Sequence, residues 1–378
     1  MQRPQSKPIK HDLEQKIVLL SGPRQCGKTT LSKQLFDQYD YFNYDFIDDR
    51  LALKEMSWDR QKPLVIFDEL HKMKNWKQWL KGIYDKQGVR PRLLVTGSAK
   101  LDTYKKTGDS LAGRFFQHRL HPLDLKEAWH YWQQDGEEIF QRLFHCGGFP
   151  EPFLKGSEEY YKRWRRTHLD IILRQDLIDL EAVRDIQGIE VLITLLKTRV
   201  GQCVSYANLA RDLERDPTTV KRWLQLLENL YIIFKVSPYH SNIARSLLKE
   251  PKYFFYDIGQ VASNEGNKLE NLVACSLLKE LQLLEDLTGA QTGLHYLRTK
   301  DGKELDFLVV INDKPCYLIE GKWSDDKPAN GFKYFRSYFP EAKAVQLVKN
   351  ISREKTFADG LEIRNVVSWL CQLDLRQD

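Results

Sequence analysis

The stretch GPRQCGKTT, residues 22–30, decides the fold of the N-terminal part of the chain. It matches the pattern GxxxxGK[ST] at every fixed position, follows the apolar run Ile17–Leu20, and precedes an amphipathic helix that we expect to begin near Lys28. Such a loop binds phosphates because its backbone N–H groups turn inward and the helix N-terminus favours negative charge. The pattern therefore predicts that ATP binds at Gly22, Pro23, Arg24, Gln25, Cys26, Gly27, Lys28, Thr29 and Thr30.

A second apolar run, Leu64–Phe67, delivers Asp68 and Glu69 to its carboxyl end, where open parallel sheets bind ligands. We expect Lys28 to contact the β and γ phosphates, and Thr29 and Asp68 to hold Mg²⁺. Glu69 is placed to polarise the attacking water as a general base, so the pair predicts hydrolysis as well as binding.

Short apolar runs without polar alternation suit strands that are buried on both faces, as in a parallel sheet covered by helices. The sequence therefore predicts an α/β P-loop domain whose sheet includes Ile17–Leu20, Tyr44–Ile47, Leu64–Phe67 and Leu93–Thr96. The last run leads into Ser98, which would place a hydroxyl near the γ-phosphate.

Arg114 lies in SLAGRFF, residues 110–116. An arginine at this point of the chain would complete a neighbouring subunit's site by neutralising transition-state charge in trans. It would equally be a surface arginine in a loop, and spacing alone leaves both interpretations open.

Four segments in this order, GPRQCGKTTL, LVIFDELHK, LLVTGSA and SLAGRFF, resemble the AAA-type ATPase domain of a widespread group of bacterial and archaeal ATP-binding proteins. CGGFPEPF, residues 146–153, resembles that group's link out of the ATPase domain. The resemblance implies a sensor-like role for Ser98 and an arginine finger at Arg114. It also implies a winged-helix region and a C-terminal domain of unknown function. His71 stands where the group usually has Gln.

The composition bounds the remaining interpretation. A chain of 378 residues with 42% hydrophobic and 29% charged residues predicts two or three soluble globular domains. No run is long and apolar enough for a membrane span, and the N-terminus lacks a signal peptide, so we expect a cytoplasmic location.

The six cysteines are scattered, which predicts reduced thiols. The net charge of +6 permits a polyanionic partner. The basic run at residues 160–166 would stack on bases or form a packed, solvated helix, and we favour the helix.

Residues 206–256 predict a helix, a turn, a second helix and a β-hairpin, an order that resembles a winged helix-turn-helix. Apolar positions from Val220 to Leu230 form one face of the second helix. Its polar face would meet DNA through Thr218, Thr219, Lys221 and Arg222. Many winged helices instead pack against other domains.

On two adjacent strands near the C-terminus, alternation would bring Asp306, Glu320 and Lys322 to one face. This set resembles the D…ExK signature of the restriction-endonuclease-like superfamily, and Glu270 matches an additional acidic position of its junction resolvases. Two carboxylates and a lysine can hold Mg²⁺ and activate water for phosphodiester cleavage. The signature also arises by chance, and we favour binding without cleavage.

We therefore expect an AAA-type P-loop ATPase core at residues 1–120, a helical lid or linker at 121–200, a winged helix at 201–262 and an α/β restriction-endonuclease-like domain at 263–378. The predicted function is Mg-dependent ATP hydrolysis by a homo-oligomer, coupled to binding or remodelling of DNA, with branched DNA as a candidate form. The alternatives are an ATP-regulated switch or scaffold that binds a protein partner and has a catalytically silent nuclease-like domain, and an ATP-regulated nuclease.

Overall fold

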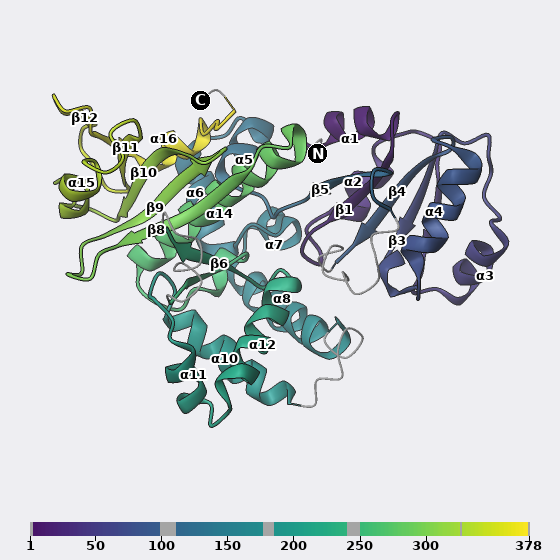
Figure 1. The fold of residues 1–378 in the computed structure, drawn as a ribbon, viewed down its shortest axis with the longest axis horizontal. Coiled ribbons are helices and arrows are strands. Elements are labelled where there is room, and N and C mark those ends of the chain that lie inside the picture. Colours follow the sequence, from purple (N-terminus) through teal and green to yellow (C-terminus); the bar gives the residue numbers. More distant parts are fainter. Residues whose placement is uncertain (1–2, 99–110, 177–184, 240–249, 326, 377–378) are drawn as a thin grey trace. The chain divides into compact units, whose positions relative to one another are not determined.

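The computed structural model describes residues 3–98, 111–176, 185–239, 250–325 and 327–376. The chain divides into two units, Met1–Pro122 with Asn229–Tyr231, and Leu123–Glu228 with Ile232–Asp378. Figure 1 shows the course of the chain through both units, and each is described here by itself.

The first unit contains a five-stranded sheet of order β2-β3-β4-β1-β5, in which every pairing is parallel. A parallel sheet needs crossover connections, and helices provide most of them. The elements are α1 (Ser6–Leu13), β1 (Ile17–Ser21), α2 (Lys28–Lys33), β2 (Asp40–Asn43), α3 (Ile47–Glu55), β3 (Leu64–Asp68), the 3₁₀ turn η1 (Leu70–Lys72), α4 (Trp76–Gln87), β4 (Arg92–Gly97) and β5 (Phe115–Arg119).

The central strands β1, β3 and β4 are buried on both faces, which explains their continuous apolar sequences. Alternate residues such as Leu19 and Phe67 share one core cluster with Leu53 of α3 and Leu80 of α4. The opposite face is covered by α1, which contacts β1 and β4, and by α2, which contacts β3 and β4. The prediction of a parallel α/β sheet is confirmed for these strands.

Two strands of this sheet differ from the sequence prediction. The predicted strand Tyr44–Ile47 is wrong, because β2 occupies Asp40–Asn43 and Ile47 begins α3. Phe46 and Ile47 are 63% and 72% exposed, so their apolar character does not reflect burial in the sheet. The prediction also missed β5, an edge strand whose polar residues give no apolar run.

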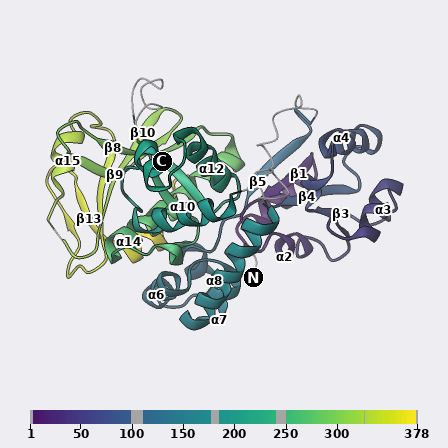
Figure 2. The same cartoon turned by 90° about the horizontal axis from the view of Figure 1, so that it is seen from below.

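The second unit begins with four helices, which confirms the predicted helical stretch after His121. α6, α7 and α8 contact one another, and Figure 2 shows them grouped together. CGGFPEPF comprises the last residue of α6, the turn at residues 147–149 and the first turn of α7, whereas the two units divide at Pro122. The helical elements of this part are α5 (Leu125–Trp132), α6 (Gly136–Cys146), α7 (Pro150–Lys155), α8 (Glu158–Ile171), the π-helical turn η2 (Ile172–Asp176), α10 (Ile186–Thr198), α11 (Tyr206–Asp212) and α12 (Pro217–Asn229).

An eight-stranded mixed sheet of order β12-β13-β11-β10-β9-β8-β6-β7 fills the rest of this unit. The antiparallel hairpin β6–β7 follows α11 and α12, as the winged-helix pattern predicts. The strands are β6 (Ile233–Pro238), β7 (Lys252–Phe255), β8 (Thr292–Arg298), β9 (Glu304–Ile311), β10 (Lys314–Lys322), β11 (Lys343–Val348), β12 (Lys355–Thr356) and β13 (Glu362–Asn365).

The hairpin is part of the C-terminal sheet, because β6 pairs in parallel with β8 at Ser237 and Pro238. The segments predicted as a winged helix and as a separate C-terminal domain therefore share one sheet, and their separate boundaries stay a prediction. Three helices and a 3₁₀ turn complete the unit: η3 (Ile258–Gln260), α14 (Glu265–Thr288), α15 (Asn330–Phe335) and α16 (Val366–Cys371).

The long helix α14 lies against this sheet and contacts β7, β8 and β10 (Figure 1). Its buried residues include Leu269, Leu277 and Leu281, and they also include Glu270, a charged residue on the sheet side. Among the described residues, no helix combines the length and the hydropathy that a bilayer span requires.

Candidate nucleotide-binding and hydrolysis site

The loop after β1 has the backbone conformation of a phosphate-binding loop. Gly22 has φ +153° and Gly27 has φ +99°, while Gln25 between them has φ +61°. A Cβ at Gly22 would lie 2.2 Å from the carbonyl oxygen of Leu120, so only glycine fits there. Successive residues of this kind direct their N–H groups into one concavity, which is a site for an anion.

Lys28 is the first residue of α2 and its side chain is buried in this loop. Its ammonium donates to the backbone carbonyls of Gly22 at 2.9 Å and Pro23 at 2.7 Å. Cys26 is also buried, and its thiol donates to the carbonyl of Leu120 at 3.4 Å. Because the partners of Lys28 are neutral, its positive charge is available to phosphate oxygens.

Asp68 ends β3 and is 5% exposed. Its Oδ2 accepts from the hydroxyl of Thr29 at 2.7 Å and from that of Tyr41 at 2.8 Å. Its Oδ1 accepts a short hydrogen bond from the hydroxyl of Thr96. Three hydroxyls from α2, β2 and β4 thus fix one carboxylate at the carboxyl edge of the sheet.

Glu69 follows directly with φ +53°, which turns its side chain away from the strand direction. Its Oε2 accepts from the hydroxyl of Ser98 at 3.3 Å and lies 3.6 Å from Nδ1 of His71. Burial raises the pKa of Glu69, Lys28 opposes this shift, and Asp68 adds to it. Burial lowers the pKa of His71 to about 4, and nearby lysines add to the shift, so the imidazole is neutral at pH 7.

The other predicted loop residues vary in exposure. Arg24 and Thr29 are half-buried, whereas Gln25 and Thr30 are exposed. Sequence reasoning missed Tyr41, which contacts Asp68. The alternation of Asp40–Asn43 is too short to mark a strand, and only the parallel pairing of β2 with β3 shows the contact. Burial raises the pKa of Tyr41 and Asp68 adds to the shift, so its phenol stays a hydrogen-bond donor.

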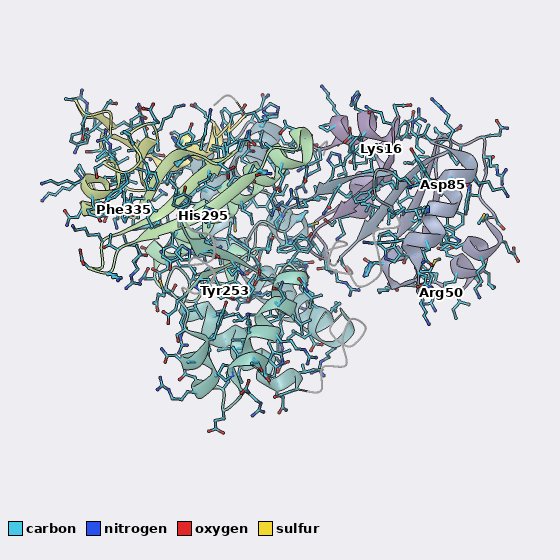
Figure 3. All side chains as sticks on the ribbon, viewed as in Figure 1. Lys16, Arg50, Asp85, Tyr253, His295 and Phe335 are labelled. Carbon is cyan, nitrogen blue, oxygen red and sulfur yellow. The ribbon has the colours of Figure 1, made fainter. Side chains whose placement is uncertain are left out.

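Arg114 lies at the amino ends of the strands of the same sheet, whereas the phosphate-binding loop lies at their carboxyl ends. Its carbonyl accepts from the N–H of Ile17, the first residue of β1, whereas the phosphate-binding loop follows the last residue of β1. A five-residue strand spans about 16 Å. The guanidinium pairs with Asp85 of α4 at 2.7 and 3.3 Å; Figure 3 labels Asp85 on this helix. Arg114 therefore does not reach the nucleotide site of its own subunit.

The second unit gathers the C-terminal residues that the sequence singled out. The backbone N–H of Asp306 donates to Glu320 at 3.2 Å, and Lys322 pairs with Glu320 at 2.6 Å. Lys252 of β7 joins them from across the sheet. Its buried ammonium lies 3.0 Å from Glu270 and 3.8 Å from Asp306.

This cluster contains two charged residues that the sequence did not predict, Lys252 and Glu304. Lys252 also lies 2.7 Å from Glu304, which sequence reasoning did not include. Burial raises the pKa of Glu270 and the charge of Asp306 adds to the shift, while Lys252 opposes it. The pKa of Glu320 is raised by burial and by Asp306, with Lys322 opposing. Within the described ranges, no group of three or more His, Cys, Asp or Glu is arranged to hold a metal ion.

The residues predicted to contact DNA lie at the start of α12. Thr218 donates its N–H and hydroxyl to Asp216 at 2.8 and 2.6 Å, so the Asp216 carboxylate caps the N-terminus of the helix. Lys221 and Arg222 are exposed, and Thr219 is half-buried. The opposite face, with Val220, Trp223, Leu224 and Leu227, is buried as the periodicity predicts.

Comparison with known proteins supports the N-terminal part of this interpretation. Residues 14–129 match a family model described as an AAA domain. Residues 137–270 and 265–369 match two domains of unknown function, DUF8612 and DUF4143. The N-terminal part is thus similar to an AAA domain, which supports an ATP-dependent activity, and the C-terminal part is similar to the DUF4143 domain of unknown function. The winged helix and the restriction-endonuclease-like fold stay predictions.

Similar chains occur in bacteria and archaea. The chain is 29% identical over 314 residues to an uncharacterized protein of Mycobacterium tuberculosis, covering 79% of this chain and 68% of that protein. It is 25% identical over 395 residues to an uncharacterized protein of Haemophilus influenzae, covering 94% of each. An uncharacterized protein of Methanocaldococcus jannaschii is 26% identical over 356 residues, covering 83% of this chain and 78% of that protein.

A solved structure is also similar, at 15% identity and a TM-score of 0.29. It is a Signal Transduction ATPase with Numerous Domains (STAND) protein with a tetratricopeptide repeat sensor from Pyrococcus horikoshii. The similarity covers 74% of this chain and 46% of that one.

Proposed function

We propose that the first unit binds Mg-ATP and hydrolyses it. The observation that carries this proposal is the pair of carboxylates at one sheet edge, one held by the hydroxyl of Thr29 and the other by that of Ser98. Asp68 is placed to bind a metal ion, and Glu69 is placed to act as a general base towards water. Lys28 would contact the β and γ phosphates when they replace the carbonyls that hold it.

The donors present fit Mg²⁺. The Thr29 hydroxyl and the Asp68 carboxylate are hard oxygen ligands 2.7 Å apart, which is the chemistry this ion prefers. When bound, the ion neutralises charge on the phosphates. Thr96 and Tyr41 hold Asp68 in place through their own hydrogen bonds.

Glu69 would accept a proton from the attacking water. A raised pKa makes this carboxylate a stronger base, and its partner Ser98 keeps one oxygen oriented. Neutral His71 leaves Glu69 without a salt bridge that would weaken it as a base. Steady-state ATP turnover with and without EDTA tests the proposal. Turnover that is absent with Mg²⁺, while the nucleotide still binds, would reject hydrolysis.

The proposal extends to a homo-oligomer in which Arg114 serves a neighbouring site. Its position at the amino edge of the sheet supports action in trans only, and its pair with Asp85 would have to open. Arg114→Ala alone should lose turnover while it retains ATP binding. Mixed with Lys28→Ala subunits, it should recover part of the activity. A mixture that stays inactive would argue for the surface interpretation.

Coupling to DNA is the second part of the proposal, and the exposed side chains of Lys221 and Arg222 on α12 support it. ATP turnover and binding should be measured across single-stranded, duplex, forked and four-way DNA. Stimulation by any of these supports the coupling. Indifference to all of them would favour the switch or scaffold that binds a protein partner.

For the C-terminal cluster we propose binding without cleavage. Lys252, which lies outside the D…ExK pattern, pairs with Glu270 and Glu304 and so supplies counter-charge where a nuclease would bind metal ions. The assay is nicking of supercoiled DNA with Mg²⁺ or Mn²⁺. Nicking that disappears in Asp306→Asn would establish the ATP-regulated nuclease instead.

A further inference from the structure

A groove of about 680 Å³ lies on the second unit, lined by α8, η2 and α10. Its walls include the basic run that the sequence singled out at residues 160–166. Tyr161 and Trp164 of that run are buried, so the aromatic residues pack the helix as we favoured. Three cations of that run line the groove, together with one from η2 and one from α10: Lys162, Arg165, Arg166, Arg174 and Lys197.

The groove has fewer carboxylates than cations. Among the described residues, Asp170 and Glu190 are the acidic groups of its lining, and Asp170 pairs with Arg174 at 2.5 Å. Lys162 pairs with Glu158 at an exposed position on the same helix. In the part of the chain that the structure describes, no ion pair joins the remaining three cations to a carboxylate: Arg165, Arg166 and Lys197.

Arg165 of α8 and Lys197 of α10 both line this groove, so two like charges share it. Burial lowers the pKa of Lys197, and the charge of Arg165 lowers it further, against a weaker opposing effect of Asp257. Asp257 is itself engaged, since it accepts from the hydroxyl of Tyr161 at 2.8 Å and from the N–H of Gly259 at 3.2 Å. Like charges held together in a half-buried groove favour an anion between them.

The spacing of the cations indicates an extended ligand. Lys162 and Arg166 lie about one turn apart on the same face of α8, and Arg174 follows eight residues later in the π-helical turn η2. At 1.5 Å per residue the first and last are about 18 Å apart, which exceeds the reach of one phosphate group. The floor is apolar, with Leu173 and Ile193 each 1% exposed.

The groove offers little to read a base sequence. The hydroxyl of Thr167 donates to the carbonyl of Trp164, and that of Thr194 donates to the carbonyl of Glu190. Recognition would therefore rest on charge and on apolar contact, which is how proteins bind single strands without sequence preference.

We propose that this groove takes the phosphate backbone of a nucleic-acid strand. The proposal rests on the DNA coupling proposed above, and it assigns the backbone contact to α8 and α10 instead of α12. The contact is independent of sequence and depends on salt, because each neutralised phosphate releases counterions.

The test uses the full chain and fluorescently labelled single-stranded and duplex DNA of about 20 nucleotides, which exceeds one site of this kind. The double variant Lys162→Gln with Arg166→Gln removes two exposed cations. We expect its affinity to fall at least about tenfold, and the slope of log K against log salt to fall by about two. A double variant of two exposed lysines elsewhere in the unit, Lys314→Gln with Lys333→Gln, is the matched control.

A second double variant, Lys221→Gln with Arg222→Gln, separates this inference from the proposed DNA coupling. If the α12 variant loses DNA binding while the groove variant binds DNA as tightly as the wild type, the groove proposal is overturned and the proposed DNA coupling remains. A wild-type chain that binds poly-glutamate but neither DNA form would overturn both, while ATP turnover still tests hydrolysis separately. Circular dichroism and thermal melting confirm that each variant folds.

Discussion

The candidate nucleotide site and the C-terminal cluster both combine carboxylates with a buried lysine beside a β-sheet, but the two lysines have different partners. Lys28 is held by two neutral carbonyls at 2.7–2.9 Å. Lys252 is held by the carboxylates of Glu270 and Glu304 at 3.0 and 2.7 Å. An ammonium that bonds to carbonyls keeps its charge for an incoming anion, whereas one that bonds to carboxylates is already neutralised.

The carboxylates differ in the same way. Asp68 accepts from three hydroxyls and from the backbone N–H of Glu69, which are all neutral donors, so its negative charge remains available to a cation. In the C-terminal cluster, Glu320 pairs directly with Lys322. The comparison indicates a site prepared for a ligand in the first unit and a self-compensated cluster in the second. The predictions below test that contrast.

The largest effect should come from Lys28→Ala. It removes the charge that meets the phosphates, so ATP binding should weaken by about 100-fold. Transition-state stabilisation should fall by about another 100-fold, which lowers kcat/KM by about 10⁴. Turnover and binding of a fluorescent ATP analogue measure both. Lys54→Ala changes an exposed lysine of the same unit and should retain wild-type values.

Glu69→Gln should separate binding from chemistry. It keeps the size of the side chain and removes the base, so kcat should fall by about 10²–10³ while ATP affinity stays within about twofold. Single-turnover hydrolysis and equilibrium binding measure the two quantities. Normal turnover in this variant would remove Glu69 as the base. Glu55→Gln, at an exposed position of α3, is the control.

Lys252→Met should unfold the second unit more readily. Removing one partner of a buried charge cluster leaves uncompensated carboxylates, at a loss of about 3–5 kcal/mol in the free energy of unfolding. Chemical denaturation measures it. Adding Glu304→Gln should restore part of the loss, because one of the carboxylates that pair with Lys252 is then replaced by a neutral amide. Lys28→Met should change stability by less than about 1 kcal/mol, and an equal loss in both would contradict the contrast.

The last effect concerns pH and is small within any one pH unit. The pKa of Glu270 rises from 4.5 to about 8 on folding, because of burial and Asp306, while Glu304 and Asp306 also hold Lys252. Between these values the folded state binds more protons than the unfolded state, so this contribution to stability is complete below 4.5 and is lost as pH rises towards 8.

Glu270→Gln mimics the protonated side chain and should flatten this decline by at most about 1.4 kcal/mol per pH unit. Denaturation of wild type and variant across the same pH range measures the difference. A parallel pH dependence in the two proteins would show that Glu270 is already ionised in the folded state.

The sequence predicted what depends on local pattern. Strands β1, β3 and β4 and the loop at Gly22 were found because burial on both faces leaves a continuous apolar run and because the phosphate-binding loop needs fixed glycines. Strand alternation also predicted that Asp306 and Glu320 lie together, and the antiparallel pairing of β9 with β10 places them in hydrogen-bond contact. Their chemical role stays a prediction.

What the sequence did not predict depends on tertiary contact. Strand β5 has Gln117 and His118 where a buried strand would have apolar residues. Tyr41 reaches Asp68 only because β2 lies beside β3. Lys252 precedes an apolar run, and from sequence alone a lysine at such a position is expected to be exposed to solvent. It is buried because the fold places Glu270 and Glu304 beside its ammonium.

The pairing of β6 with β8 has a practical consequence for dissecting the chain. A fragment that begins at residue 263 would keep β8 but lose the hairpin that covers its edge. The open N–H and C=O groups of that strand would then offer a template for a second molecule. Such a fragment should form edge-to-edge aggregates, whereas one that begins near residue 123 keeps the whole sheet and should stay monodisperse.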